Sequence, residues 1–158
     1  MKNFDTKKIQ DRLESISKEF DGMMAQIGFP SGKKYEDGTN VAEVAAIHEY
    51  GAPKAKIDAR PFFRPAIKKH HDEWVDVLKD KIPDVLSKKE TSFDVLDYVG
   101  RIAAANVQKE ISEVTSPPLK EETIKRKGFD KPLIDTGYML ASVTNSVAKK
   151  GSEFVSKN

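Results

Sequence analysis

The tripeptide Asp135-Thr136-Gly137 is the sharpest sign of chemistry in the sequence. Aspartic proteases of the retroviral type carry the catalytic carboxyl in Asp-Thr-Gly, and two such carboxyls pair across a dimer so that they share one proton. Those enzymes are built from strands, whereas helical patterns surround this tripeptide, and Tyr138 follows where a small residue is expected. The sequence therefore favours Asp135 as the N-cap of a helix that begins at Thr136. An aspartic-type protease is kept as the least favoured alternative.

Histidines and carboxylates come together at two places that suggest a metal site: His48 with Glu49, and His70 and His71 with Asp72 and Glu73. Neighbouring residues on a helix point about 100° apart, so His70 and His71 cannot easily bind one ion. No His-Glu-x-x-His pattern occurs. We therefore expect no metal, with His48 half-buried at a helix end and His70 in the apolar stripe that includes Trp74.

Other signatures of catalysis are missing from the sequence. There is no cysteine, which excludes disulfides, thiolate catalysis and Cys-based zinc sites, and is compatible with folding in a reducing cytoplasm. Neither the P-loop pattern nor GxGxxG occurs, so no glycine-rich phosphate cradle is expected. Serine and threonine are plentiful, but no histidine is placed to activate one as a nucleophile. The prediction is a protein that is not an enzyme and has no cofactor.

Two basic clusters, Lys54 to Arg64 and Lys125 to Lys131, could contact phosphates. A DNA-binding accessory protein is therefore an alternative function, and nearby Phe62, Phe63 and Phe129 would allow base stacking. The plainer interpretation is a solvated loop and helix end, or contacts with acidic partner surfaces. Arg60 and Arg64 beside two phenylalanines are also typical of protein interface anchors.

The length and composition indicate one globular domain spanning residues 1–158. The chain is 38% hydrophobic and 33% charged, and its net charge of +2 gives no strong attraction to nucleic acid or membranes. No stretch approaches the roughly 18 apolar residues of a membrane helix, and we expect the protein to be made in the cytoplasm of its host cell.

The periodicity of the first half predicts four segments. Ile9, Leu13, Ile16 and Phe20 form one stripe of a helix over residues 6–20. Alternation from Met23 to Phe29 predicts a strand. The polar residues 31–40 read as an exposed, mobile loop, and a short helix capped by Asn40, with Glu43 in a capping box, follows and ends at Gly51.

Two long helices follow. The first begins near Pro61 and runs to Ile82, with Pro83 expected to end or kink it. The second opens at Thr91 with Asp94 and closes before Pro117-Pro118. Its slim middle at Gly100 is expected to approach the preceding helix, and its predicted buried stripe consists of Phe93, Leu96, Val99, Ala103, Val107, Ile111 and Val114.

The last segments complete an α+β prediction. A short basic helix over Lys120 to Lys127 is capped by Gly128, the helix after Asp135 follows, and residues 142–155 form a hairpin that turns near Lys150-Gly151. The expected fold is a single domain in which several helices, two of them long and central, pack on a small, mostly antiparallel sheet.

Two blocks of the sequence resemble a family. Ala45 to Gly51 with Ile57 to Pro65, and Lys131 to Val143, are similar to blocks of the neck and tail-completion proteins of tailed bacteriophages. In many of those proteins the two blocks occur in the opposite order. The residues that carry the resemblance, and that we take as interface or structural positions, are His48, Glu49, Tyr50, Gly51, Arg60, Pro61, Phe62, Phe63, Arg64, Pro65, Asp135, Thr136 and Gly137.

The resemblance implies a virion structural protein at the head–tail junction, forming a homo-oligomeric ring between the connector and the tail tube or tail terminator proteins. DNA would only pass through the ring lumen, and no membrane would be involved. Arg60, Phe62, Phe63 and Arg64 would fix the corner or a contact between subunits. Residues 135–137 would set a turn, and the loop 31–40 would become ordered against a partner.

Overall fold

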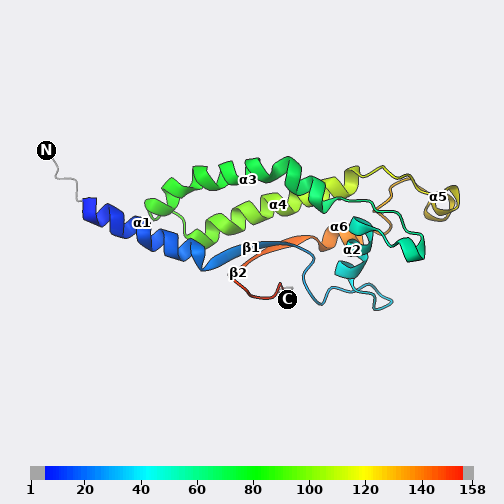
Figure 1. Ribbon diagram of the computed structural model, residues 1–158, viewed down its shortest axis with the longest axis horizontal. Coiled ribbons are helices and arrows are strands. Elements are labelled where there is room, and N and C mark those ends of the chain that lie inside the picture. Colours follow the sequence, from blue (N-terminus) through cyan, green and yellow to red (C-terminus); the bar gives the residue numbers. More distant parts are fainter. Residues whose placement is uncertain (1–5, 155–158) are drawn as a thin grey trace.

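Two long helices packed side by side form the spine of the protein (Figure 1). The computed structural model describes residues 6–154. Its elements, in chain order, are α1 (Thr6–Asp21), β1 (Met23–Gly28), α2 (Val41–Tyr50), the 3-10 helix η1 (Pro53–Ala55), α3 (Phe63–Leu86), α4 (Ser92–Glu113), α5 (Glu121–Lys127), α6 (Tyr138–Ser142) and β2 (Thr144–Lys149). The α+β prediction, with two central helices and a small antiparallel sheet, is confirmed.

The start of α4 is set by local sequence, as predicted. The Thr91 hydroxyl accepts from the Asp94 amide at 3.1 Å, and the Asp94 carboxylate accepts from the Thr91 amide at 2.9 Å. This reciprocal capping box satisfies two groups that a helix start leaves without partners. It lets the chain reverse within a few residues, so α4 returns along α3 as the second arm of a helical hairpin (Figure 1).

The helix α3 continues past Pro83 to Leu86, so the expectation that it stops at Ile82 is wrong. A proline removes one helical hydrogen bond, but here only one more turn follows. That turn carries Val85, which is fully buried in a small core with Ile16 and Val95. We attribute the extra turn to this burial.

The buried face of α4 differs from the predicted stripe in its first turns. Phe93 is 43% exposed, whereas Val95 is completely buried. From Ala103 onward the predicted positions Ala103, Val107 and Ile111 are buried. The slim middle at Gly100 faces β2 rather than α3, because a Cβ there would lie 3.0 Å from the side-chain nitrogen of Asn145.

The sheet has two strands, and the predicted hairpin at the C-terminal end is wrong. The strand β2 pairs antiparallel with β1, from Met23 opposite Lys149 to Gly28 opposite Thr144. The chain does turn after Lys149, but residues 152–154 form no strand. The end of the predicted hairpin, Val155, lies outside the described residues. The pairing partner was missed because it is more than a hundred residues away in the sequence.

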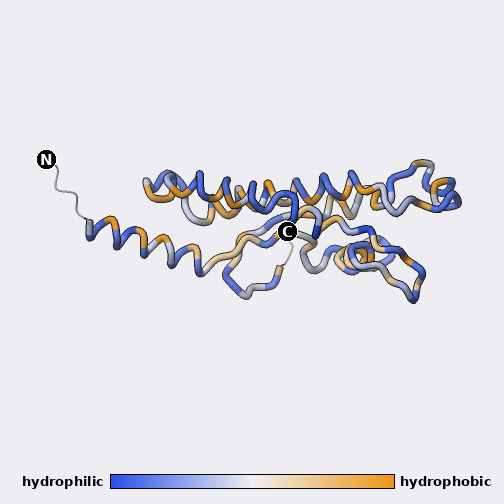
Figure 2. Tube along the Cα trace, turned by 45° about the horizontal axis from the view of Figure 1, so that its top comes forward, coloured by the Kyte–Doolittle hydropathy of each residue, from blue (hydrophilic) through white to orange (hydrophobic). Residues whose placement is uncertain are grey.

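The helix α1 is only partly packed. Its predicted stripe is buried at Ile16, but Ile9 is 44% and Leu13 is 49% exposed. Figure 1 shows the reason: the first half of α1 extends beyond the end of the α3–α4 hairpin. In Figure 2 the apolar positions continue along this extension, so the stripe is longer than the surface that covers it.

The main core lies at the opposite end, where α2, the start of α3, the second half of α4 and α6 meet. Its buried residues are Val41, Ala45, Phe62, Ala66, Ala104, Val107, Ile111, Leu133, Met139 and Val143. The two blocks that carry the family resemblance therefore pack against each other.

The loop 31–40 closes on itself through backbone hydrogen bonds. The Tyr35 amide donates to Thr39 O at 2.9 Å, and the Val41 amide donates to Lys33 O at 3.0 Å. The Asn40 side chain caps α2 by accepting from the Ala42 amide at 3.0 Å. The loop thus has a defined hydrogen-bonded path into α2, while its mobility and its ordering by a partner stay predictions.

Candidate functional site

Glu49 is the centre of the corner that joins α2 to α3. Its carboxylate is almost fully buried and accepts from the amides of Phe62 at 2.8 Å, Phe63 at 2.9 Å and Arg64 at 3.1 Å. These amides belong to the first turn of α3, which has no side-chain cap of its own. A carboxylate at this end of a helix satisfies unpaired donors and interacts favourably with the helix dipole.

Arg64 completes the surroundings of Glu49. Its Nε donates to the Glu49 carboxylate at 2.8 Å, and its Nη2 donates to the Glu49 carbonyl at 3.0 Å. Burial alone would raise the pKa of the Glu49 carboxyl, but the bonds from Arg64 and the three amides outweigh it, so the pKa lies below its ordinary value. The guanidinium also lies 4.9 Å from the centre of the exposed Tyr50 ring.

Gly51 allows the chain to turn back toward Glu49. Its φ of 76° and ψ of 170° are accessible in practice only to glycine. A Cβ at this position would lie 2.9 Å from the Ala59 nitrogen, so the two arms of the corner could not approach as they do. The Arg60 amide then donates to the His48 carbonyl at 2.7 Å and closes the loop.

Arg60 connects the corner to the segment after α4. Its Nε donates to the Pro117 carbonyl at 2.9 Å and its Nη2 to the Pro118 carbonyl at 3.2 Å. These are carbonyls without a regular secondary-structure partner, and the bonds hold two distant segments together. Arg60 therefore braces the corner against the segment after α4 within the chain, while its contact with another copy stays a prediction.

Phe62 is fixed inside the core. It is 1% exposed, and its ring meets Phe29 edge to face with centroids 6.2 Å apart. Phe63 lies beside it and is partly buried, with Pro61 and Pro65 on either side in the sequence. A buried ring cannot stack on a nucleic-acid base, so the packed-corner interpretation of Phe62 is the one that the structure supports.

The Asp135-Thr136-Gly137 segment forms a turn, but Asp135 is not a helix cap. The helix α6 begins at Tyr138, with Gly137 as the residue before it at a φ of 78°. The Thr136 hydroxyl accepts from the Tyr138 amide at 3.3 Å. The cap prediction failed because Gly137 adopts the left-handed conformation and delays the helix by two residues.

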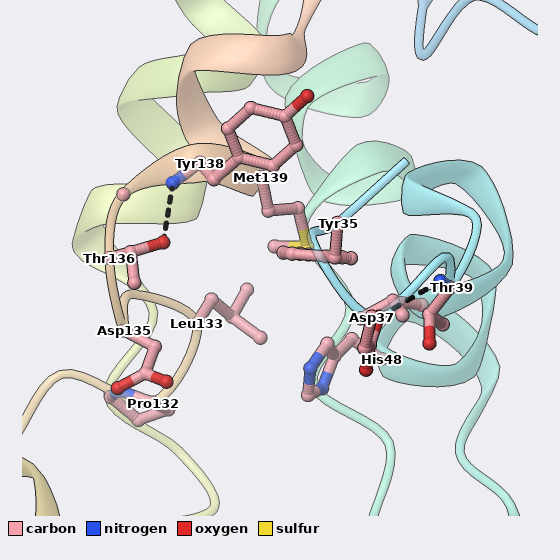
Figure 3. A pocket seen from close by; sticks show the side chains of 12 residues that line it. Tyr35, Asp37, Thr39, His48, Pro132, Leu133, Asp135, Thr136, Tyr138 and Met139 are labelled. Carbon is pink, nitrogen blue, oxygen red and sulfur yellow. Dashed lines mark hydrogen bonds between the residues drawn. The ribbon is translucent and has the colours of Figure 1, made fainter. Parts of the chain in front are cut away.

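A cavity of about 320 Å³ lies between the loop 31–40, α2 and residues 132–139 (Figure 3). His48 and Asp135 both line it, so the two sequence blocks meet there. His48 Nδ1 is buried and has no hydrogen-bond partner among the described residues. Burial, together with the charges of Arg60 and Lys127, lowers the pKa of His48.

Two acids line this cavity, one on each side. Asp135 comes from the segment before α6, whereas Asp37 comes from the loop on the other side (Figure 3). The Asp37 carboxylate accepts from the Thr39 amide at 2.9 Å, which lowers its pKa. Within one copy of residues 6–154, neither acid is hydrogen-bonded to another carboxyl. The shared proton of a retroviral-type protease lies between carboxyls of two copies, so the protease stays the least favoured alternative.

Histidine and carboxylate side chains do not gather into a metal site in the described part of the chain. His70 Nδ1 lies 2.7 Å from Glu73, and its ring stacks on Trp74 with centroids 6.4 Å apart, which fits the predicted place in the apolar stripe. His71 is exposed and lies 3.0 Å from Asp72. The two rings thus have separate partners.

The sequence analysis identified most residues of the corner but missed what Glu49 does. A helix cap supplied from 13 residues upstream has no local pattern.

No helix among residues 6–154 combines the length and apolar character that crossing a membrane requires. Comparison with models of known protein families, with curated proteins and with solved structures finds no match to this chain.

Proposed function

We propose that this chain is a structural subunit of a tailed-bacteriophage virion and that it forms a ring at the head–tail junction. The proposal starts from the resemblance of the blocks around Gly51, Pro65 and Gly137 to neck and tail-completion proteins. In this function the protein acts by assembly with sister copies and with connector and tail proteins, and it transforms no substrate.

The internal contacts of the corner suit a rigid surface that binds neighbouring proteins. The Glu49 carboxylate is occupied by three amides and Arg64, and Arg60 is occupied by two carbonyls. These groups are committed to holding α2, α3 and the segment after α4 in one arrangement. A rigid corner lowers the entropic cost of docking, because its side chains are already ordered before a partner binds.

The observation that carries the proposal is the placement of uncovered apolar side chains toward opposite ends of an elongated subunit. At one end, the first half of α1 extends past the hairpin (Figure 1), and the α1 side chains of Ile9 and Leu13 are 44% and 49% exposed. Toward the other end lies a hollow of about 290 Å³ whose lining includes Phe29, Ala42, Ala46, Tyr50, Phe63 and Ile67. Different surfaces at two ends allow the head-to-tail contacts that close into a ring.

We infer that the apolar edge of α1 from one copy occupies the hollow of the next copy. A single helix edge with two anchors, Ile9 and Leu13, spaced four residues apart, matches the helix-in-groove mode of recognition. The hollow is mainly apolar and lies beside Arg64 and Tyr50, which gives the aromatic and arginine content common in interfaces.

The test uses particles of the phage or prophage that encodes the chain. The double variant Ile9→Glu with Leu13→Glu should keep its thermal midpoint, because both side chains are exposed, but should be lost from the junction in electron micrographs. The control is Gln10→Glu with Ser17→Glu, which adds the same charge to exposed positions of α1. Purified particles that lack the wild-type polypeptide at the junction would overturn the proposal.

A further inference from the structure

The two basic clusters of the sequence converge on one groove. It measures about 400 Å³ and lies between the loop 56–60, the segment 118–120 and α5. Five cationic side chains line it: Lys56, Arg60, Lys120, Arg126 and Lys127. The linear sequence separates these residues by up to 71 positions, so only the fold brings them together.

The positive charge of the groove is only partly balanced by the protein. None of the five cations is in an ion pair with a carboxylate within residues 6–154, whereas Lys69, Lys81 and Arg101 of the long helices are paired. Two carboxylates, Asp58 and Asp135, line the groove, which leaves an excess of three positive charges. A concave surface with one sign of charge focuses its field on an oppositely charged ligand.

Two of the cations are held in place by the backbone. Arg60 is fixed by the carbonyls of Pro117 and Pro118, and Lys127 Nζ donates to the Lys131 carbonyl at 2.6 Å. Burial is the main cause that lowers the pKa of Lys127. The charge of Asp135 opposes this shift, and the charges of Arg126 and Arg60 add to it. The groove therefore already holds cations close together before a ligand arrives, and an anion would relieve their repulsion.

We propose that this groove binds the phosphodiester backbone of DNA. Lysine supplies three of the five cations, and lysine is depleted in protein interfaces but common in contacts with phosphate. The aromatic ring of Phe62 is in the core and offers no face for a base. We therefore expect binding that depends on salt and is indifferent to base sequence.

This inference goes beyond the proposed ring, because it concerns a surface that each isolated subunit already has. Binding is measured on the purified chain by fluorescence anisotropy of a short labelled duplex of mixed sequence, at salt concentrations from about 50 to about 200 mM. The key variant is Lys56→Gln, Arg126→Gln and Lys127→Gln together. The matched control is Lys18→Gln, Lys68→Gln and Lys149→Gln, three exposed lysines outside the groove, with the same change in net charge.

The groove variant should bind at least tenfold more weakly than the wild type. Its plot of log affinity against log salt should flatten by about 3, since each phosphate contact contributes about 1 to that slope. The control should stay within about twofold of the wild type. Arg126→Gln alone, at an exposed position of α5, should flatten the slope by about 1 and serves if the triple variant loses its fold.

Three outcomes would overturn the inference. The wild type fails to bind the duplex at the lowest salt, or the control loses as much affinity as the groove variant, which would make general charge responsible. The third outcome is that polyglutamate binds more tightly than DNA and is lost in the groove variant, which would assign the groove to an acidic protein surface. Ring assembly of the same variants is scored separately by electron microscopy, so failure of DNA binding leaves the ring proposal intact.

Discussion

At the scale of single residues, the function of the corner depends on one buried carboxylate. The Glu49 carboxylate accepts hydrogen bonds from three backbone amides at the start of α3 and also forms an ion pair with Arg64. The helix has no side-chain cap of its own at this end. Arg64 is largely exposed, so the ion pair itself is screened by solvent. The three amide bonds are buried at Phe62 and part-buried at Phe63 and Arg64, so they should contribute most of the stabilisation.

The substitution Glu49→Gln should lower the free energy of unfolding by about 2 to 4 kcal/mol. The glutamine amide oxygen is a weaker acceptor than a carboxylate, and the glutamine NH2 group would face backbone N–H groups that are themselves donors. Urea titration followed by circular dichroism measures this loss. The control Glu43→Gln, at an exposed position of the same helix, should change stability by less than about 0.5 kcal/mol. Equal effects of both substitutions would contradict the capping role.

The pH dependence of stability provides a second test of Glu49. Its pKa in the folded state lies below the ordinary value of 4.5, so its contribution is fully present above that pH and is lost as the pH falls through the folded-state pKa. The stability difference between the wild type and Glu49→Gln should be constant from neutral pH down to about 4.5 and should shrink as the pH falls further. A stability difference between the wild type and Glu49→Gln that grows on acidification would contradict a lowered pKa of Glu49. Measuring a difference cancels the similar trend expected from Asp37 and Asp94.

Gly51 and Gly128 form a matched pair for testing the turn of the corner. Both have a positive φ, but a Cβ at Gly51 would meet the backbone of Ala59, while a Cβ at Gly128 would meet open space. We expect Gly128→Ala to cost about 1 kcal/mol and Gly51→Ala to cost at least about 3 kcal/mol. Thermal unfolding of the two variants decides this, and equal shifts would show that the approach of the two arms is unstrained.

At the scale of elements, local sequence patterns predicted where helices and strands occur better than they predicted which segments pack or pair with each other. The capping box at Thr91 and the glycine after α5 are short-range signals, and both elements begin or end near the predicted residues. The partner of β2 and the true buried face at Val95 depend on contacts with distant segments, and these predictions were wrong. The same holds for the candidate site. Its residues lie in recognisable motifs, but the hydrogen bonds of Glu49 reach residues on the other side of the corner and have no local pattern.

The uneven packing of α1 predicts that the same substitution costs much more stability at one position than at another. Ile16→Ala should cost about 2 to 4 kcal/mol, because it opens a cavity against Val85 and Val95. Ile9→Ala should cost less than about 1 kcal/mol, because its side chain is 44% exposed and beyond the hairpin. Chemical denaturation gives both values. A large loss at Ile9 would mean that the isolated subunit already covers this part of α1.

At the scale of the whole molecule, a helix extension with recurring apolar positions lies at one end (Figure 2), and the main core lies toward the other. An exposed apolar edge is costly for a protein that stays alone, and burial of such surface is a main driving force of association. The basic groove is separate from both apolar surfaces, since its lining shares no residue with the hollow beside Tyr50. Subunit contact and phosphate contact can thus occur together.

Hydrogen exchange should follow this division when subunits assemble. In the isolated chain, amides of residues 6–13 should exchange faster than amides in the middle of α4, because Ile9 and Leu13 are 44% and 49% exposed whereas Ala103 and Val107 are buried. In particles, residues 6–13 and the rim of the hollow around Tyr50 should become protected together, because the proposed head-to-tail contact would bury both surfaces at once. Peptide-level mass spectrometry resolves the two segments, and α4 serves as the internal reference. Protection of α1 without protection of the hollow would show that another virion protein covers the helix and would refute the head-to-tail contact.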